Sequence, residues 1–195
     1  SGKDLLAVAA ANDFAVPAFN VSDYSMLRAI VEIAEEKQAP LIIAIHPNEI
    51  ANLGWDVMPS VIQIARKASV PVAIHWDHGA DYEQILQAIQ GGFTSVMIDG
   101  SLLPFEENVA IPKKVVDAAH AVGVSVEGEL GTIGKTDTYA ESGADSIVYT
   151  VPADAVSFVE RTGVDSLAIA IGTRHGIYPS DLQPELKLDL LEEIN

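Results

Sequence analysis

The sequence Val70-Pro71-Val72-Ala73-Ile74-His75-Trp76-Asp77-His78-Gly79 joins a short apolar run to a cluster of ionisable residues and a glycine. The same order recurs downstream, where the run Ser166–Ile171 leads into Gly172-Thr173-Arg174-His175-Gly176. In α/β barrels, residues at the carboxyl ends of parallel strands carry the chemistry. Two such histidines, one of them beside an aspartate, suggest a metal site with an acid/base partner.

Short runs rich in Val, Ile and Ala alternate with amphipathic helical patterns along the whole chain. Such compact runs are typical of parallel strands that are covered on both faces. The predicted strands are Ala15–Phe19, Leu41–His46, Val72–Trp76, Ser95–Asp99, Val124–Glu129 and Ser166–Ile171. The predicted helices are Tyr24–Ala34, Pro59–Lys67, Tyr82–Gln90, Asn108–Ala121, Ala153–Arg161 and one that begins near Leu186.

This alternation narrows the fold to an open doubly wound sheet or a (β/α)8 barrel. The open sheet has little support, because no Gly-x-Gly-x-x-Gly follows the first strand and no Walker-type loop occurs. A complete barrel takes about 250 residues, whereas the chain has 195. We therefore predict one (β/α)8 barrel domain over residues 1–195, with six of the eight βα units present and the C-terminal part missing.

Composition excludes several classes of partner and site. The 28 acidic against 11 basic residues give a net charge of −17, which argues against binding to nucleic acid. No apolar run approaches the roughly 20 residues that cross a bilayer, and no signal peptide is apparent. The chain has no cysteine, so a transition metal would need His, Asp or Glu ligands. These features predict a cytoplasmic protein that has no membrane partner.

Six motifs occur in order along the chain, and they include both histidine clusters. They are Ala18–Asn20, Trp76–Gly79, Met97–Ser101, Val126–Gly131, Val159–Ala168 and Ile171–Gly176. In these motifs the chain resembles the class II ketose-bisphosphate aldolases, the zinc-dependent fructose- and tagatose-bisphosphate aldolases. The resemblance implies a (β/α)8 barrel that reversibly cleaves a ketose 1,6-bisphosphate to dihydroxyacetone phosphate and an aldehyde such as glyceraldehyde 3-phosphate.

The resemblance also implies metal ligands and a catalytic acid/base. Asp77 would exchange a proton with the hydroxyl that derives from the aldehyde. His78 and His175 would be two of three histidine ligands to a catalytic Zn2+. Asp99 and Glu129 match positions that the family uses for a second or alternative metal, and a monovalent cation is a further option. An alternative reading of Asp99 is a cap on the turn into Ser101.

Substrate contacts are implied for two further positions. Asn20 would contact the sugar phosphate, and Gly176 would help to hold its dihydroxyacetone phosphate end. The family's third zinc histidine and its phosphate-binding loop after strand eight have no counterpart in these 195 residues. Family members form dimers or tetramers, so we expect a homodimer or homotetramer.

The chemistry suits these residue types without the family name. Breaking a carbon–carbon bond next to a ketone leaves an enediolate, which Zn2+ stabilises as an electrophile. A carboxylate beside the cation suits removal of the hydroxyl proton. The rival Schiff-base route needs a lysine, and the candidates Lys67, Lys113, Lys114 and Lys187 do not follow predicted strands.

Two stretches leave alternatives open. The family moves the enediolate proton with an acidic residue on a mobile loop, and in loop 131–143 the candidates are Asp137 and Glu141. After the second predicted strand, His46 stands where relatives often carry a small hydroxyl residue. It is either a packed loop histidine or a substrate contact that favours a different aldehyde, such as an unphosphorylated one. A different class of hypothesis is a non-catalytic barrel remnant with a structural or regulatory role.

Overall fold

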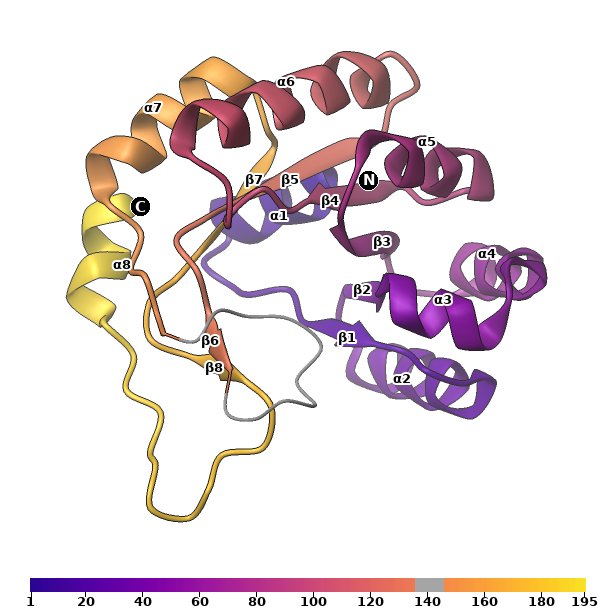
Figure 1. The fold of residues 1–195 in the computed structure, drawn as a ribbon. Coiled ribbons are helices and arrows are strands. Elements are labelled where there is room, and N and C mark those ends of the chain that lie inside the picture. Colours follow the sequence, from indigo (N-terminus) through magenta and orange to yellow (C-terminus); the bar gives the residue numbers. More distant parts are fainter. Residues whose placement is uncertain (136–145) are drawn as a thin grey trace. The chain divides into compact units, whose positions relative to one another are not determined.

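The computed structural model describes residues 1–135 and 146–195. Six strands form one sheet in the order β1-β2-β3-β4-β5-β7, and β6 pairs with β8 in a separate two-stranded sheet (Figure 1). The strands are β1 (Ala18–Asn20), β2 (Leu41–Ile45), β3 (Val72–Gly79), β4 (Ser95–Ile98), β5 (Ser125–Leu130), β6 (Gly134–Lys135), β7 (Ser166–Ile169) and β8 (Arg174–His175).

Helices follow most of these strands, as the alternating pattern predicts. They are α1 (Gly2–Ala11), α2 (Tyr24–Lys37), α3 (Pro47–Leu53), the 3₁₀ turn η1 (Trp55–Val57), α4 (Met58–Lys67), α5 (Tyr82–Gly91), α6 (Phe105–His120), α7 (Pro152–Thr162) and α8 (Leu188–Ile194). Among the described residues, no helix is long and apolar enough to cross a membrane.

The chain divides into two compact units, residues 1–98 with 114–127 and residues 99–113 with 128–195. In the first unit the neighbours β1–β2, β2–β3 and β3–β4 all pair in parallel. Helices α2, α3, α4 and α5 pack against these strands. The second unit contains β6, β7, β8, α7 and α8.

The core of the first unit explains why its strands are apolar. All four residues of β4 are buried, as are four of the five in β2. Burial on both faces selects the continuous Val, Ile and Ala runs. The helices begin where the sequence supplies a cap: Asp23 accepts hydrogen bonds from the backbone N–H groups of Ser25 and Met26, and Asp81 accepts one from Gln84.

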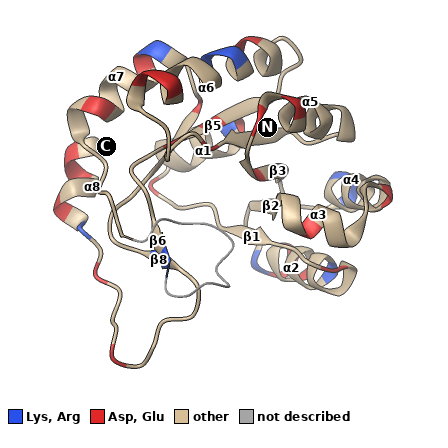
Figure 2. Cartoon of the chain, viewed as in Figure 1, with Lys and Arg blue, Asp and Glu red and all other residues tan. Residues whose placement is uncertain are grey.

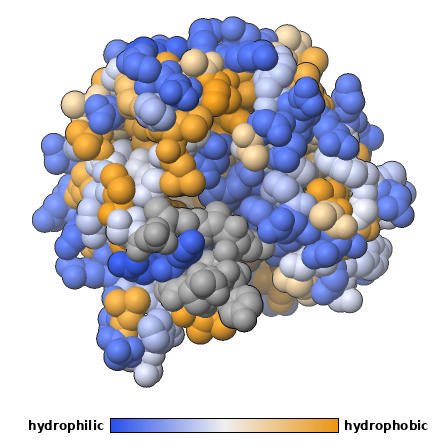
Figure 3. Space-filling model, in the orientation of Figure 1, coloured by the Kyte–Doolittle hydropathy of each residue, from blue (hydrophilic) through white to orange (hydrophobic). Residues whose placement is uncertain are grey.

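Acidic side chains account for the charge imbalance. Helix α8 carries Asp189, Glu192 and Glu193 and no basic residue, and Figure 2 shows Asp and Glu along other helices as well. Hydrophilic residues cover much of the face seen in Figure 3, with hydrophobic residues between them. Some large apolar side chains are exposed, among them Val156 and Ile177 in the second unit.

The observed end of β3 lies three residues beyond the predicted one. The apolar run predicts an end at Trp76, but pairing with β4 continues to Gly79. Trp76 pairs with Val96 and Gly79 pairs with Ile98, so three steps on β3 match two on β4. This offset is a β-bulge at Asp77 and His78, and bulges re-aim side chains near active sites. Apolar periodicity carries no signal for such an insertion.

Other elements differ from the prediction as well, among them the first strand, the last predicted strand and α3. The first strand runs over Ala18–Asn20 rather than Ala15–Phe19, because its pairing with β2 begins at Ala18. The last predicted strand ends at Ile169, two residues early. Helix α3 is a short helix that sequence periodicity does not indicate, since its seven residues make only two turns.

Candidate active site at the carboxyl ends of the strands

Asp77 lies in the bulge of β3, and its carboxylate faces a neighbour on β1. The amide Nδ2 of Asn20 donates to Asp77 Oδ2 over 2.8 Å. The sheet order brings these residues together, since β1, β2 and β3 are consecutive neighbours. An alternative role for Asp77 is the N-cap of the following helix, but that position is held by Asp81. The carboxylate of Asp77 is therefore directed to another strand end.

A second carboxylate, that of Glu49, lies beside the same amide. Glu49 is buried, with 6% of its surface exposed. Its Oε2 accepts hydrogen bonds from the backbone N–H of His46 over 2.7 Å and from Asn20 Nδ2 over 3.4 Å. Its Oε1 accepts from the hydroxyl of Ser22 over 3.2 Å. Asn20 therefore bridges two carboxylates from different parts of the chain.

His78 adopts a backbone conformation that side chains rarely take. Its φ of +50° lies in the left-handed region, where a non-glycine residue is strained. Such strain is most common at functional sites, where the surrounding structure holds it in place. Its Nε2 lies 3.8 Å from Asp77 Oδ1. The ring of His46 lies close by, with centroids 6.0 Å apart.

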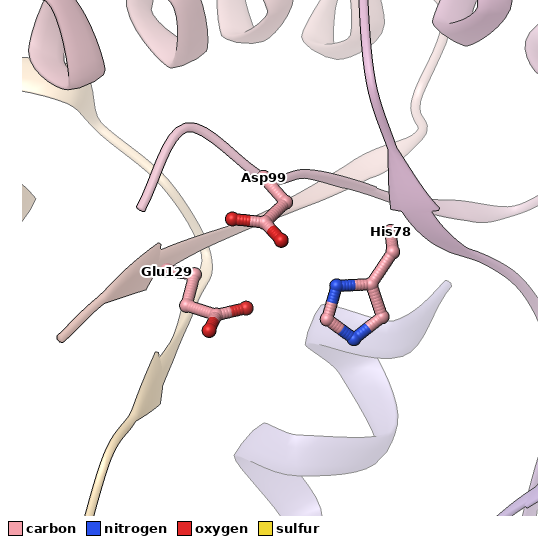
Figure 4. Close-up of side chains that lie close together, drawn as sticks. All are labelled: His78, Asp99 and Glu129. Carbon is pink, nitrogen blue, oxygen red and sulfur yellow. The ribbon is translucent and has the colours of Figure 1, made fainter. Parts of the chain in front are cut away.

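Three predicted metal-site residues come together in the structure. One ligand atom each of His78, Asp99 and Glu129 lies within 4.8 Å of the others. Figure 4 shows both carboxylates directed towards the imidazole. His78 lies in β3, Asp99 directly follows β4, and Glu129 lies in β5. One imidazole nitrogen and two carboxylate oxygens form a donor set that suits Zn2+ and other divalent cations, so these residues fit a metal.

Neighbouring groups hold Asp99 and the backbone of Glu129 in place. Asp99 Oδ1 accepts a hydrogen bond from the backbone N–H of Ser101 over 2.9 Å, so the turn-capping alternative holds alongside membership of the cluster. Asn108 is buried and donates from Nδ2 to the backbone carbonyl of Glu129 over 2.9 Å. A Cβ on Gly100 would lie 2.5 Å from Asn108 Oδ1, so the residue after Asp99 must be small.

The second histidine motif lies in the second unit. Arg174 and His175 form β8, where they pair with Gly134 and Lys135 of β6. The backbone N–H of Arg174 donates to the hydroxyl of Tyr178 over 2.6 Å. His175 is half-buried, and Gly176 is exposed with a φ of +97° that favours glycine. The ligand role of His175 and the substrate role of Gly176 stay predictions.

Three predicted site residues remain, and the structure describes only one of them, His46. Asp137 and Glu141 lie outside the described residues. His46 is buried and forms the N-cap of α3, with its Nδ1 accepting from the backbone N–H of Asn48 over 3.1 Å. This contact supports the packed reading of His46 and leaves its other ring nitrogen, Nε2, as the donor of the neutral ring.

A buried polar layer lies further down the strands. His75 Nδ1 lies 2.8 Å from Ser95 Oγ, and its Nε2 lies 3.7 Å from Glu127 Oε2. His75 and Asp77 are two residues apart on β3, as Glu127 and Glu129 are on β5, which is the spacing of one strand face. The face of β5 that carries Glu127 and Glu129 is therefore in part a buried one.

Sequence reasoning missed Glu49 and Asn108. The signal for Glu49 is its place three residues after His46, with proline between them, which is a helix N-terminal pattern. That pattern predicts an exposed cap and not a buried carboxylate. Asn108 carries no signal beyond its place in a helix, because its contacts come from strands that are distant in sequence.

Comparisons with known proteins give matches along the whole chain. The family model for fructose-bisphosphate aldolase class-II matches residues 1–195. The chain is 44% identical to a fructose-bisphosphate aldolase of Thermus caldophilus over 94% of its own length and 60% of that protein's. It is 41% identical to one of Staphylococcus aureus strain Mu50, over all of its own length and 68% of that protein's. It thus spans 60–68% of the length of these relatives.

Solved structures show the same fold. The YdjI aldolase of Escherichia coli K12 matches with a TM-score of 0.86 and 37% identity, over 100% of this chain and 67% of that one. A fructose-bisphosphate aldolase of Campylobacter jejuni matches with a TM-score of 0.74 and 27% identity, over 100% and 63%. The predicted fold class, an α/β chain of the TIM-barrel type with part of the barrel present, is confirmed.

Proposed function

Because the chain belongs to the class II fructose-bisphosphate aldolase family, we propose that the protein reversibly cleaves a ketose 1,6-bisphosphate of the fructose or tagatose type. The products are dihydroxyacetone phosphate and an aldehyde such as glyceraldehyde 3-phosphate. The observation that carries the proposal is the Asp77 carboxylate, which is hydrogen-bonded to Asn20 and lies beside His78. A cytoplasmic location and a homodimer or homotetramer belong to the same proposal.

Asp77 is the acid/base of the cleavage step. In cleavage it takes the proton of the C4 hydroxyl, the C3–C4 bond breaks, and C4 leaves as the aldehyde carbon. The electron pair of that bond stays on the dihydroxyacetone phosphate fragment as an enediolate. In the reverse direction Asp77 returns the proton to the new hydroxyl. Asn20 donates to Oδ2, which leaves Oδ1 for the proton transfer.

The donor set beside Asp77 supports a metal cofactor. His78 and His175 would hold Zn2+, while Asp99 and Glu129 would hold a second or alternative metal or a monovalent cation. When bound, a divalent metal supplies electrophilic stabilisation of the negative charge that develops on the oxygens of the dihydroxyacetone phosphate fragment. The clustering of His78, Asp99 and Glu129 supports this part of the proposal.

A second acid must protonate the enediolate carbon to complete cleavage. We assign that proton transfer to Asp137 or Glu141, in the sequence stretch 131–143. A glycine-rich loop with polar residues suits a lid that closes over bound substrate. Substitution of each residue in turn, with proton exchange at dihydroxyacetone phosphate as the readout, distinguishes the two candidates.

A related aldolase that accepts a different aldehyde is the second candidate function. It is favoured by His46, whose buried ring lies at the carboxyl end of β2, 6.0 Å from the His78 ring. An imidazole there occupies more space than a small hydroxyl side chain and offers a hydrogen-bond donor to the substrate. The acceptor would then be an aldehyde that is unphosphorylated or of different length.

The test is release of dihydroxyacetone phosphate from fructose and tagatose bisphosphates by the full-length protein, with and without a chelator. Chelator-sensitive release supports the metal-dependent reaction and identifies the preferred sugar. Zinc-containing protein that cleaves neither sugar supports the different acceptor. Protein with neither zinc nor activity overturns both and favours a non-catalytic role in assembly or regulation.

A further inference from the structure

Glu49 is buried far more deeply than its place in a helix cap requires. A glutamate at the third position of a helix normally reaches back to one backbone N–H at the surface. In this helix, that contact is the hydrogen bond from the backbone N–H of His46 to Glu49 Oε2, which is 2.7 Å long. Yet only 6% of Glu49 is exposed, and a carboxylate is costly to bury unless its oxygens are hydrogen-bonded. Its burial therefore points to a further role.

The other two contacts of Glu49 reach a distant part of the chain. Ser22 and Asn20, which donate to its two oxygens over 3.2 and 3.4 Å, precede it by 27 and 29 residues. They lie at and just after the end of β1, whereas Glu49 lies in α3 after β2. All of these residues belong to the first compact unit. Glu49 therefore ties the end of β1 to the start of α3.

These contacts determine which way the Asn20 amide points. Its Nδ2 has two N–H groups, and it lies 2.8 Å from Asp77 Oδ2 and 3.4 Å from Glu49 Oε2. The reverse orientation would place the side-chain oxygen of Asn20 against two carboxylates. Neither carboxylate can donate a hydrogen bond when it is ionised. Two acceptors on one nitrogen therefore direct Asn20 Oδ1 away from both acids, where it can accept from a substrate hydroxyl.

We propose that Glu49 is a positioning residue that orients the Asn20 amide and, through it, the carboxylate of Asp77. This proposal rests on the proposed aldolase function for its effect on turnover. Glu49 acts on the reaction through Asn20 and does not touch the reacting atoms. When the amide is held in this orientation, Asp77 Oδ2 keeps its hydrogen bond from Asn20 Nδ2, and Asp77 Oδ1 stays 3.8 Å from His78 Nε2.

Three substitutions of Glu49 test the role in the full-length protein. Glu49→Gln keeps an oxygen that accepts from His46 and Asn20, so kcat should stay within about threefold of the original protein. Glu49→Ala removes both acceptors, and kcat should fall about ten- to hundredfold with a smaller change in KM. Glu49→Met fills the same space without an acceptor and should match Glu49→Ala, which covers the case in which the alanine variant does not fold.

A matched control separates positioning from stability. Thr162 is also buried, and its hydroxyl donates to the carbonyl of Phe158 at the end of α7, in the second unit. Thr162→Val should lower the melting temperature while leaving kcat unchanged. Zinc content should stay the same in all variants. Equal kcat for Glu49→Ala, Glu49→Met and the original protein would overturn the proposal, as would a Gln variant as slow as the Met variant.

A spectroscopic readout keeps the test independent of the reaction. The side-chain amide resonances of Asn20 in a ¹⁵N NMR spectrum should shift or broaden in Glu49→Met and stay close to their original positions in Glu49→Gln. If the original protein cleaves no ketose bisphosphate but these shifts occur, the aldolase function fails and the positioning contact stands. If the protein is active and the Asn20 resonances do not respond, the positioning role fails alone.

Discussion

The two histidine motifs look alike in sequence but lie in different settings. His78 is the seventh residue of an eight-residue strand with neighbours on both sides, β2 and β4. His175 lies in a two-residue strand, and the preceding β7 is the last strand of the six-stranded sheet. Four of the first five β3 residues are buried, but all four in β7 are only half-buried. The same local pattern therefore follows a mostly buried strand in one unit and a half-buried strand in the other.

The difference in burial between β3 and β7 comes from the strands that pair with them and not from the histidine motif. A strand with partners on both edges has its backbone groups paired, so polar residues at its end can be held in a strained conformation such as that of His78. Among the described residues, β7 is the last strand in the order of the sheet and pairs on one side. We therefore expect substitutions around β3 to have larger effects than matched ones around β7.

The largest expected effect is that of Asp77→Asn on turnover. The amide cannot accept the substrate proton, so kcat should fall about 10²- to 10⁴-fold. Release of dihydroxyacetone phosphate measures the effect. Asp81→Asn is the matched control, since asparagine caps a helix as well as aspartate does, and it should leave kcat unchanged. An active Asp77→Asn variant would remove Asp77 from the acid/base role.

A pair of isoleucine substitutions tests the comparison of the two strands directly. Ile74 in β3 is 3% exposed, and Ile74→Ala should lower the free energy of unfolding by about 2–5 kcal/mol. Ile169 in β7 is half-buried, so Ile169→Ala should cost about 1–2 kcal/mol. Urea denaturation followed by circular dichroism measures both. Equal losses would show that β7 is as well packed as β3 and would break the comparison.

The two histidines should both contribute to zinc affinity. Loss of a residue that only hydrogen-bonds to a metal ligand costs roughly 10- to 100-fold in metal affinity. We expect His78→Ala and His175→Ala, which each remove a ligand itself, to weaken zinc binding by at least as much. Equilibrium dialysis against zinc measures this. His78→Gly is the backbone control, because glycine adopts a φ of +50° without strain. It should be more stable than His78→Ala and equally poor in zinc. Unchanged affinity in His175→Ala would remove that residue from the ligand set.

The smallest expected effect concerns an exposed ion pair within the second unit. Arg161 donates to both carboxylate oxygens of Glu106, over 2.9 and 2.6 Å, and these hydrogen bonds lower the pKa of Glu106 from its ordinary 4.5. A carboxyl group whose pKa is lowered in the folded protein adds stability at pH values above its ordinary pKa. This stability is lost as the pH falls through the lowered pKa. Because the pair is exposed, the effect should be small.

Thermal unfolding of Glu106→Gln at several pH values measures that contribution. The melting temperature of the variant should lie slightly below that of the original protein near neutral pH, and the two should converge in acid. A difference that grows as the pH falls would contradict the assigned sign.

Much of the fold was predictable from residues close together in sequence. Compact runs of Val, Ile and Ala identified all six strands of the main sheet, because burial on both faces excludes polar residues. Caps such as Asp23 and Asp81 are local signals as well. Pairing decided the strand ends. The bulge in β3 arises from its register with β4. The sequence of β3 alone does not indicate this register.

The sequence by itself determined the set of chemical groups: histidines, acids and an asparagine at strand ends, and no cysteine. Only the tertiary structure decided which of them meet. It grouped His78 with Asp99 and Glu129, and it placed Asn20 between Asp77 and the buried Glu49. The physical reason is that such contacts join strands tens of residues apart, so the order of the strands in the sheet, and not the spacing of residues along the chain, brings the groups within hydrogen-bonding distance.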